Sequence, residues 1–548
     1  MAKSSKTRAS KQAYVSPSQG ILCLFEMPFS GSLSADNRWV VLARQLPWDL
    51  LVNIYKKQMN NDKTGAGGIN PRVVLGALII KHICDLSDRE TIQQIQENVY
   101  MQYFIGYSGF SNSAPFDASL FVEIRKRLGM EQINAINERI IQFVQEKQEN
   151  KSTDMVSGNQ PKILDENRNA PTNEQISESN ISDTVEGSEE GKIKDKPEQT
   201  APISAVVNQG TMIIDATVCP QDIAYPTDLN LLNDARKKSE ELIDLLYKPE
   251  LHEKKPRTYR RKARKLYLSE AKKKSSSAKA IRRANGKQIA FLRRNIGHIL
   301  QLLEKYNGMP LNMQQLKYLW VIQTVLEQQE YMHKNKVNSV EQRIVSIHQP
   351  HVRPIVRGKR NAKVEFGAKI QVSLMNGFAF LDDLEWEAFH EGTRLMVSVE
   401  KYKKRFGYYP AEVLADKIYC TRENRKLLKE LNIKMRAKPL GRPSLSAAVE
   451  DHVRPGERNP IEGVFGQGKT AYGMNRIKAR LANTSGSWIA SILMVINLVK
   501  ITGLIRHVLL LTVRTFSAWG MEVFDNRKEY KSEGKINWCY TIKVPTVA

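Results

Sequence analysis

The stretch Lys363–Ser373 (KVEFGAKIQVS), followed after a short turn by Phe378–Asp382 (FAFLD), decides the fold class of this 548-residue chain. Both segments are rich in apolar, β-branched and aromatic residues, which is typical of strands. The turn between them contains Asn376 and Gly377, and an Asn-Gly pair favours an antiparallel hairpin because both residues tolerate a positive φ. We therefore expect a hairpin that forms part of a β-sheet.

Segments on both sides of the hairpin are expected to extend this sheet. Thr211–Thr217 (TMIIDAT) has the apolar, β-branched composition of a buried strand that ends in a carboxylate. After the hairpin we expect a helix over about 394–406, a strand over Glu412–Ile418, a helix over 422–431 and a short strand over about 433–437. This order predicts a mixed α/β fold, with a central sheet flanked by helices.

The region before the sheet is expected to be an all-helical domain over residues 36–148, preceded by a basic N-terminus over 1–35. Asn70 and Pro71 have the pattern of an N-cap and a first helical turn, and Ser87 with Glu90 has the spacing of a capping box. Short helices with basic residues suit helix-turn-helix DNA binding, although most small helical bundles bind no DNA.

Two long segments interrupt this pattern. Residues 149–205 are polar and almost without aromatic side chains, so we predict a disordered linker. The sheet-containing domain then spans 206–520, and 521–548 form a C-terminal tail. Within that domain, residues 234–344 are predicted to be an all-helical insertion. Its part over 254–294 contains 17 Lys and Arg and one acidic residue.

The net charge of +25 predicts a strong positive field, which favours a polyanionic partner such as DNA, RNA or acidic lipid. The basic segment of the insertion concentrates this charge. Dense blocks of one sign are common in nucleic-acid-binding arms, whereas a solvated helix face is the alternative interpretation. Arg260, Arg261, Arg264 and Lys265 are the candidate phosphate contacts.

The five cysteines are scattered and form no CxxC pair, so neither a disulfide framework nor a zinc site is indicated and a reducing cytosol fits. The most apolar region, Trp488–Phe516, is long enough to span a bilayer. Asn497, Lys500 and Arg506 interrupt it, and a central Lys or Arg costs about 3 kcal/mol in lipid. We interpret it as a helix buried against the sheet, with a membrane span as the alternative.

Acidic residues interrupt two of the predicted strands. Asp215 lies near the end of the strand at 211–217, and Asp416 lies near the end of the strand at 412–418. A carboxylate in an apolar strand costs stability unless a cation or a polar partner compensates. Phosphodiester chemistry uses two divalent ions about 3.5 to 4 Å apart, and Mg²⁺ prefers carboxylate and water ligands. The two aspartates are therefore candidate metal ligands.

A third candidate, Glu462, lies between two basic residues. At about 100° per residue, Arg458, Glu462 and Lys469 fall within about 40° of one another on a helix. Glu462 could complete a metal site there, while Arg458 and Lys469 hold phosphates on either side. A solvated Arg-Glu pair at i,i+4 is the alternative interpretation.

Five motifs together carry a family resemblance: Ile213–Thr217 (IIDAT), Arg353–Lys359 (RPIVRGK), Val364–Val372 (VEFGAKIQV), Val413–Tyr419 (VLADKIY) and Arg458–Gly466 (RNPIEGVFG). Their order resembles the bacterial insertion-sequence DDE transposases that pair an InsH-like helical N-terminal domain with an RNase H-like, retroviral-integrase-like catalytic domain. The resemblance covers nearly the whole chain except the first twenty or so residues, the linker and much of the insertion. Related enzymes carry a Tyr, Arg, Glu, Lys signature; Arg458, Glu462 and Lys469 are similar, and Pro455 occupies the tyrosine position.

The resemblance implies an RNase H-like catalytic domain over 206–520, with Asp215, Asp416 and Glu462 as catalytic residues and as ligands of two Mg²⁺ or Mn²⁺ ions. It further implies cleavage at transposon ends and transfer of the freed 3′ hydroxyl to target DNA. The implied partners are terminal inverted repeats, target DNA and further copies of the chain, in the bacterial cytoplasm at the nucleoid and with no membrane partner. A transposase-derived DNA-binding protein without catalysis and an RNase H-like nuclease without strand transfer are the alternatives.

Overall fold

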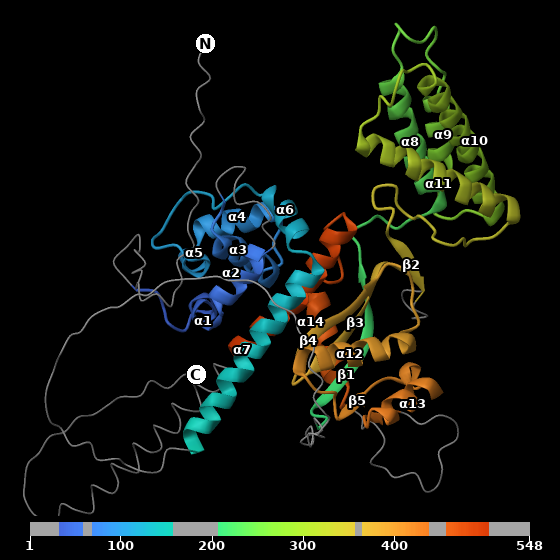
Figure 1. Ribbon diagram of the computed structural model, residues 1–548. Helices are drawn as coiled ribbons and strands as arrows, with labels where there is room; N and C mark the ends of the chain where they lie inside the picture. Colours follow the sequence, from blue (N-terminus) through green and yellow to red (C-terminus); the bar gives the residue numbers. More distant parts are fainter. Residues whose placement is uncertain (1–31, 58–67, 157–206, 357–363, 438–455, 504–548) are drawn as a thin grey trace, which may run out of the picture.

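A computed structural model describes residues 32–57, 68–156, 207–356, 364–437 and 456–503 (Figure 1). A group of N-terminal helices lies against a central sheet, and a bundle of four helices stands away from them beyond the sheet. The central sheet and its flanking helices confirm the mixed α/β class predicted from the sequence.

Six strands form one mixed sheet: β1 (Thr211–Pro220), β2 (Arg353–Val356), β3 (Val364–Met375), β4 (Phe378–Glu385), β5 (Glu412–Leu414) and β6 (Lys434–Arg436). Strand β3 pairs antiparallel with β1, β2 and β4. Strand β5 is parallel to β1, and β6 is parallel to β5. The predicted hairpin is confirmed: Asn376 and Gly377 have φ values of 51° and 76°, and Met375 pairs with Phe378.

Two strand ends differ from the sequence prediction. Strand β1 continues to Pro220 because β3 pairs with it along that whole length, so Asp215 lies in the middle of the strand. Strand β5 ends at Leu414, so Asp416 follows the strand. The Asp416 carboxylate accepts the backbone N–H of Lys417 at 2.7 Å and caps the short 3-10 helix η3 (Lys417–Tyr419), which turns the chain away from the sheet.

Helices follow and flank these strands: η2 (Glu391–Arg394), α12 (Leu395–Phe406), α13 (Arg422–Glu430), α14 (Asn459–Ala471) and a last described helix, Ala482–Gly503. By length and composition this last helix could cross a membrane, and it is the one such helix among the described residues. However, 78% of its most apolar window is buried within the protein. Ile489, Leu493 and Leu498 are fully covered, which agrees with the interpretation as a helix buried in the core. Residues 504–516 of the apolar region lie outside the described residues.

Within the described residues, seven helices precede the sheet: α1 (Arg38–Gln45), α2 (Trp48–Lys57), α3 (Pro71–Ile83), α4 (Asp88–Glu97), α5 (Val99–Ile105), α6 (Leu120–Arg127) and α7 (Met130–Val156). The predicted start signals are confirmed: Asn70 caps α3, and Ser87 with Glu90 forms the capping box of α4. Helix α7 continues to Val156, into the segment predicted as a linker from residue 149. Residues 157–206 of that segment lie outside the described residues.

The N-terminal helices share one hydrophobic core with the sheet and the last helix, and this core includes Phe104, Ile214 and Ile492. Helix α7 runs along edge strand β4 (Figure 1). The Asn137 side chain donates a hydrogen bond to the Ala379 carbonyl at 3.1 Å, and Asn497 donates to the same carbonyl at 2.8 Å. The N-terminal helices are therefore fixed on the sheet by buried polar contacts as well as by apolar packing.

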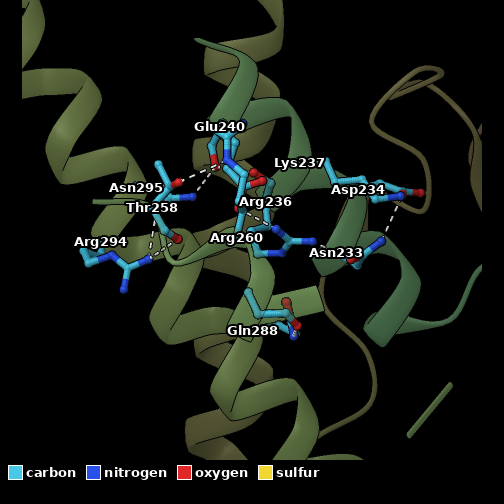
Figure 2. Close-up of polar contacts among 12 residues, drawn as sticks. Asn233, Asp234, Arg236, Lys237, Glu240, Thr258, Arg260, Gln288, Arg294 and Asn295 are labelled. Atoms are coloured by element: carbon cyan, nitrogen blue, oxygen red, sulfur yellow. Dashed lines mark hydrogen bonds and ion pairs between the residues drawn. The ribbon is translucent and has the colours of Figure 1, made fainter. Parts of the chain in front are cut away.

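The insertion is a bundle of four helices: α8 (Asp228–Leu246), α9 (Arg260–Ala271), α10 (Ala278–Leu303) and α11 (Met313–Asn335). It starts earlier than predicted, because the Thr227 side chain caps α8 at Asn230. The bundle has its own apolar core and a buried polar network (Figure 2). In that network Arg236 donates to Glu240 at 2.5 Å, and Arg294 donates to the Thr258 carbonyl at 2.7 Å.

Candidate catalytic site

Asp215 and Asp416 lie at the same level of two neighbouring parallel strands. The last paired residues of β1 and β5 are Ile213 and Leu414, and each aspartate follows two residues later. Paired residues of parallel strands share a face of the sheet, and side chains two residues apart return to that face. The chain therefore brings the two carboxylates together, although the insertion and the hairpin separate them in sequence.

Both carboxylates contact one guanidinium group, that of Arg458 at the N-terminal end of α14. Arg458 Nη2 lies 3.3 Å from Asp215 Oδ2, and Nη1 lies 3.4 Å from Asp416 Oδ1. The side chains of Asp215 and Arg458 are 20% and 18% exposed, whereas that of Asp416 is 58% exposed. Arg458 Nε is buried and has no hydrogen-bond partner within the described part of the chain.

The site carries more negative than positive charge. Burial raises the pKa of Asp215, and the negative charges of Glu391 and Asp416 raise it further. The Ala216 N–H, which donates to Asp215 at 2.9 Å, and the Arg458 charge oppose this shift only in part. An added cation is therefore the natural complement of this site.

Glu462 lies on α14, one helical turn beyond Arg458, and its side chain is exposed. Between residues that the structure describes, no hydrogen bond or ion pair joins Glu462 to Asp215 or Asp416. Nor do the described residues contain a group of three acidic, histidine or cysteine side chains placed to hold a metal ion. The structure thus brings two of the three predicted carboxylates together and leaves the third on the adjacent helix.

The donors that are present fit a hard divalent cation in part. Asp215 and Asp416 offer carboxylate oxygens, the ligands that Mg²⁺ prefers, and a positive group already lies between them. Arg458, predicted to hold a phosphate, instead contacts these acids. Lys469 lies in the last turn of α14. Pro455, at the tyrosine position of the resemblance, lies outside the described residues.

Gly468 lies where helix α14 approaches the last helix. A Cβ atom at Gly468 would lie 2.9 Å from Met474 Cε, the flexible end of a side chain in the turn after α14, and 3.4 Å from Ile496 Cδ1 of the last helix. Gly463 and Gly466, by contrast, face open space. The exposed face of α14 that carries Glu462 is consequently free of bulky side chains at these two positions.

The basic residues predicted on the insertion are not equivalent. Arg261, Arg264 and Lys265 are exposed on α9. Arg260 instead donates two hydrogen bonds to the Asp244 carboxylate on α8, at 3.0 and 2.9 Å. Three of the four predicted phosphate contacts are therefore open to a ligand, and the fourth joins two helices of the bundle.

Glu391 belongs to none of the sequence motifs, yet its charge acts on both Asp215 and Tyr419. Glu391 lies in η2 and forms an ion pair with Lys369 at 2.9 Å. The Tyr419 hydroxyl donates to Gln371 at 3.5 Å, and burial raises the pKa of this tyrosine well above its ordinary value. Glu391 comes near the site only through the path of the chain after the hairpin. A local sequence pattern therefore does not reveal it.

Comparison with known proteins identifies related segments at both ends of the chain. Residues 28–127 match the family described as a transposase domain (DUF772), and residues 413–499 match the family described as a transposase DDE domain. An uncharacterized protein of Rhizobium meliloti, ORF8 in the nfe locus, is 32% identical over 117 residues. These residues are 21% of this chain and 54% of that protein, so the chain spans about half the length of this curated relative. No solved structure matches the chain.

Proposed function

Because the chain belongs to the insertion-sequence DDE transposases, we propose that it cleaves DNA at the ends of a transposon and joins the freed 3′ hydroxyl to target DNA. The observation that carries the proposal is that Asp215 and Asp416, from separate parts of the chain, contact the same guanidinium group, that of Arg458. Asp416 and Glu462 both lie within the segment that matches the DDE domain family.

The strand arrangement supports an RNase H-like catalytic domain. Strands β4, β3, β1, β5 and β6 lie side by side in this order. The hairpin strand β3 is antiparallel to β1, while β5 and β6 continue the sheet in parallel. The family resemblance leads us to expect three acids in such a domain. Here they are Asp215 on β1, Asp416 after β5 and Glu462 on α14.

In the proposed mechanism Asp215, Asp416 and Glu462 would hold the divalent ions. When bound, Mg²⁺ or Mn²⁺ ions would activate the attacking oxygen and stabilise the leaving oxygen of the phosphodiester. Asp215 and Asp416 are already together, and Glu462 is exposed on the helix that carries Arg458. Phosphoryl transfer depends mainly on positioning and charge stabilisation, so the carboxylates need form no covalent bond with DNA.

DNA is the proposed partner at three surfaces. The N-terminal helices are proposed to recognise the transposon end, and Arg261, Arg264 and Lys265 to bind phosphates without sequence preference. The open space at Gly463 and Gly466 permits close approach of a DNA backbone to Glu462. Because two transposon ends must meet, we propose a dimer or larger assembly.

The proposal is tested by incubating the protein with Mg²⁺ and DNA that carries the ends of its own element. Wild type should cut at these ends and join them to a second DNA, whereas Asp416→Asn should do neither. Asp222→Asn is the matched control, because Asp222 is an exposed acid that pairs with Arg476 at 2.8 Å outside the site. Binding without cleavage by wild type would favour the DNA-binding alternative. Preferred cleavage of hybrids or junctions would favour a nuclease.

A further inference from the structure

We propose that Arg458 is an exchangeable counter-ion of the catalytic site: it bridges Asp215 and Asp416 in the metal-free chain, and it leaves them for a DNA phosphate when divalent ions bind. This inference rests on the proposed function and concerns the regulation of the same site. It makes metal binding and DNA binding depend on one side chain.

The contacts of Arg458 are longer than those of two other arginines of this protein, Arg436 and Arg125, and similar in length to the contacts of Arg394 with Asp383 and Glu385. The Arg458 guanidinium lies 3.3 and 3.4 Å from the two carboxylates. Arg436, in contrast, donates to both oxygens of Glu457 at 2.7 Å, and Arg125 donates to both oxygens of Asp88 at 2.9 Å. Charge-assisted hydrogen bonds of about 2.7 to 2.9 Å are the strong ones. Arg458 is therefore held by charge without the two-pronged hydrogen bonds that fix the other two.

Arg458 takes the place that a metal ion would need. Asp215 Oδ1 accepts the Ala216 N–H, and Asp416 Oδ1 accepts the Lys417 N–H, so backbone groups already fix both carboxylates. The guanidinium faces Asp215 Oδ2 and Asp416 Oδ1, on the side where the two acids meet. A guanidinium and a divalent cation repel each other strongly at such separations, so both cannot occupy this position.

The location of Arg458 also provides a second partner for its charge. It is the N-cap residue of α14, where free backbone N–H groups and the helix dipole favour an anion. Its Nε is buried and without a hydrogen-bond partner among the described residues, but the Nε atoms of Arg125 and Arg436 are too, so this donor does not set Arg458 apart. The planar guanidinium matches a phosphate through two parallel hydrogen bonds. A DNA backbone passing the open positions Gly463 and Gly466 would meet it there.

Exchange predicts reciprocal coupling between the two ligands. A DNA phosphate that binds Arg458 removes the competitor of the metal ion, so DNA should tighten metal binding. By the same linkage, the metal ion should tighten DNA binding by an equal factor. Without Arg458, the metal ion should bind strongly even in the absence of DNA, and the coupling should fall to the part that comes from direct contact between the metal ions and the phosphodiester.

The test measures Mn²⁺ binding to the full chain without DNA. The electron paramagnetic resonance signal of free Mn²⁺ gives the fraction that is not bound. Arg458→Gln should bind Mn²⁺ about five-fold or more tightly than wild type, the lower range of ordinary coupling between sites. Arg476→Gln is the matched control: it also removes one arginine that pairs with an aspartate, Asp222, and it should stay near wild type. Thermal unfolding of each variant shows whether it is folded.

A second measurement adds DNA to the unaltered chain and to folded Arg458→Gln. Addition of DNA should tighten Mn²⁺ binding to wild type and should change binding to Arg458→Gln less. The exchange would be overturned if folded Arg458→Gln bound Mn²⁺ no more tightly than wild type. If Asp416→Asn still abolished Mn²⁺ binding in that case, the proposed function would remain intact. If neither wild type nor Arg458→Gln binds Mn²⁺, with or without DNA, the metal site of the proposed function fails as well.

Discussion

Asp215 within β1 and Asp416 just after β5 each lie two residues beyond the last paired residues of these parallel strands, Ile213 and Leu414. This register is what brings the two acids to one guanidinium. Because side chains alternate between the faces of a sheet, a shift of one residue between β1 and β5 would turn one carboxylate to the opposite face. The site therefore depends on the register between β1 and β5, which places the two carboxylates on the same face of the sheet.

The exposed cations of α9 should govern the salt dependence of DNA binding. Removing one cation that binds a phosphate should reduce the slope of log affinity against log salt by about 0.9. We expect this decrease for Arg264→Gln, measured by fluorescence anisotropy between low and moderate salt. Arg293→Gln is the control, because Arg293 pairs with Glu330 at 2.7 Å. An unchanged slope for Arg264→Gln would exclude phosphate binding by this residue.

Asp88 should stabilise the contact between the N-terminal helices and the last helix. It pairs with Lys81 at 3.0 Å and Arg125 at 2.9 Å, and both cations lie over the ring of Trp488. Burial raises the pKa of Asp88, but the two cations more than offset this and hold that pKa below its usual value. Asp88→Asn leaves two buried cations without a counter-charge, so we expect a loss of roughly 2 to 4 kcal/mol in the free energy of unfolding.

Urea unfolding measures this loss. Glu123→Gln is the control, because Glu123 and Lys126 form an exposed ion pair on α6 and such pairs contribute little. Similar urea midpoints for the two variants would contradict the role assigned to Asp88.

Arg405 should stabilise the contact between α7 and the sheet. Its side chain is 6% exposed and lies 2.7 Å from Asp382 and 2.6 Å from Glu138. Arg405→Gln leaves the fully buried Asp382 without a cation, which should cost about 3 to 5 kcal/mol of unfolding free energy. A second substitution, Asp382→Asn, removes the uncompensated charge and should restore part of that stability. A double variant no more stable than Arg405→Gln would show that charge is not the cause.

His351 should make the folded chain less stable as the solution becomes acidic. Burial, with the nearby charges of Lys317 and Arg353, lowers its pKa from 6.5 to about 4. Between these values the unfolded chain binds more protons than the folded chain, so the free energy of unfolding falls as pH decreases from about 6.5 to about 4. His351→Gln should reduce this pH dependence, measured as the change in urea midpoint between pH 7 and pH 5. An identical change in both proteins would refute it.

The local signals of the sequence predicted the local structure well. The Asn376-Gly377 turn, the Asn70 cap and the capping box at Ser87 act through neighbouring residues, and the structure confirms each of them. The predicted end of β5 was wrong because Asp416 caps η3, and an acid that caps looks in sequence like an acid within a strand. Periodicity also cannot say which surface an apolar face will cover, so the packing of α7 along β4 was not predicted.

The candidate site was predictable in its residues and less so in its contacts. Asp215, Asp416 and Arg458 were all identified from the sequence, but the ion pairs between them depend on sheet register and on the start of α14. Helical spacing placed Arg458 beside Glu462 and suggested that Glu462 completes a metal site while Arg458 holds a phosphate. The structure instead directs Arg458 to the two aspartates and leaves Glu462 exposed.

The most direct test of the account is the single-turnover rate of Mg²⁺-dependent cleavage at transposon ends for Asp215→Asn, Asp416→Asn and Glu462→Gln. Removal of each metal ligand should lower the rate by about a thousandfold, equivalent to about 4 kcal/mol of transition-state stabilisation. DNA binding should stay near wild type, and Asp222→Asn should cleave normally. Wild-type cleavage by any of the three carboxylate variants would contradict the assignment of these acids as the catalytic centre.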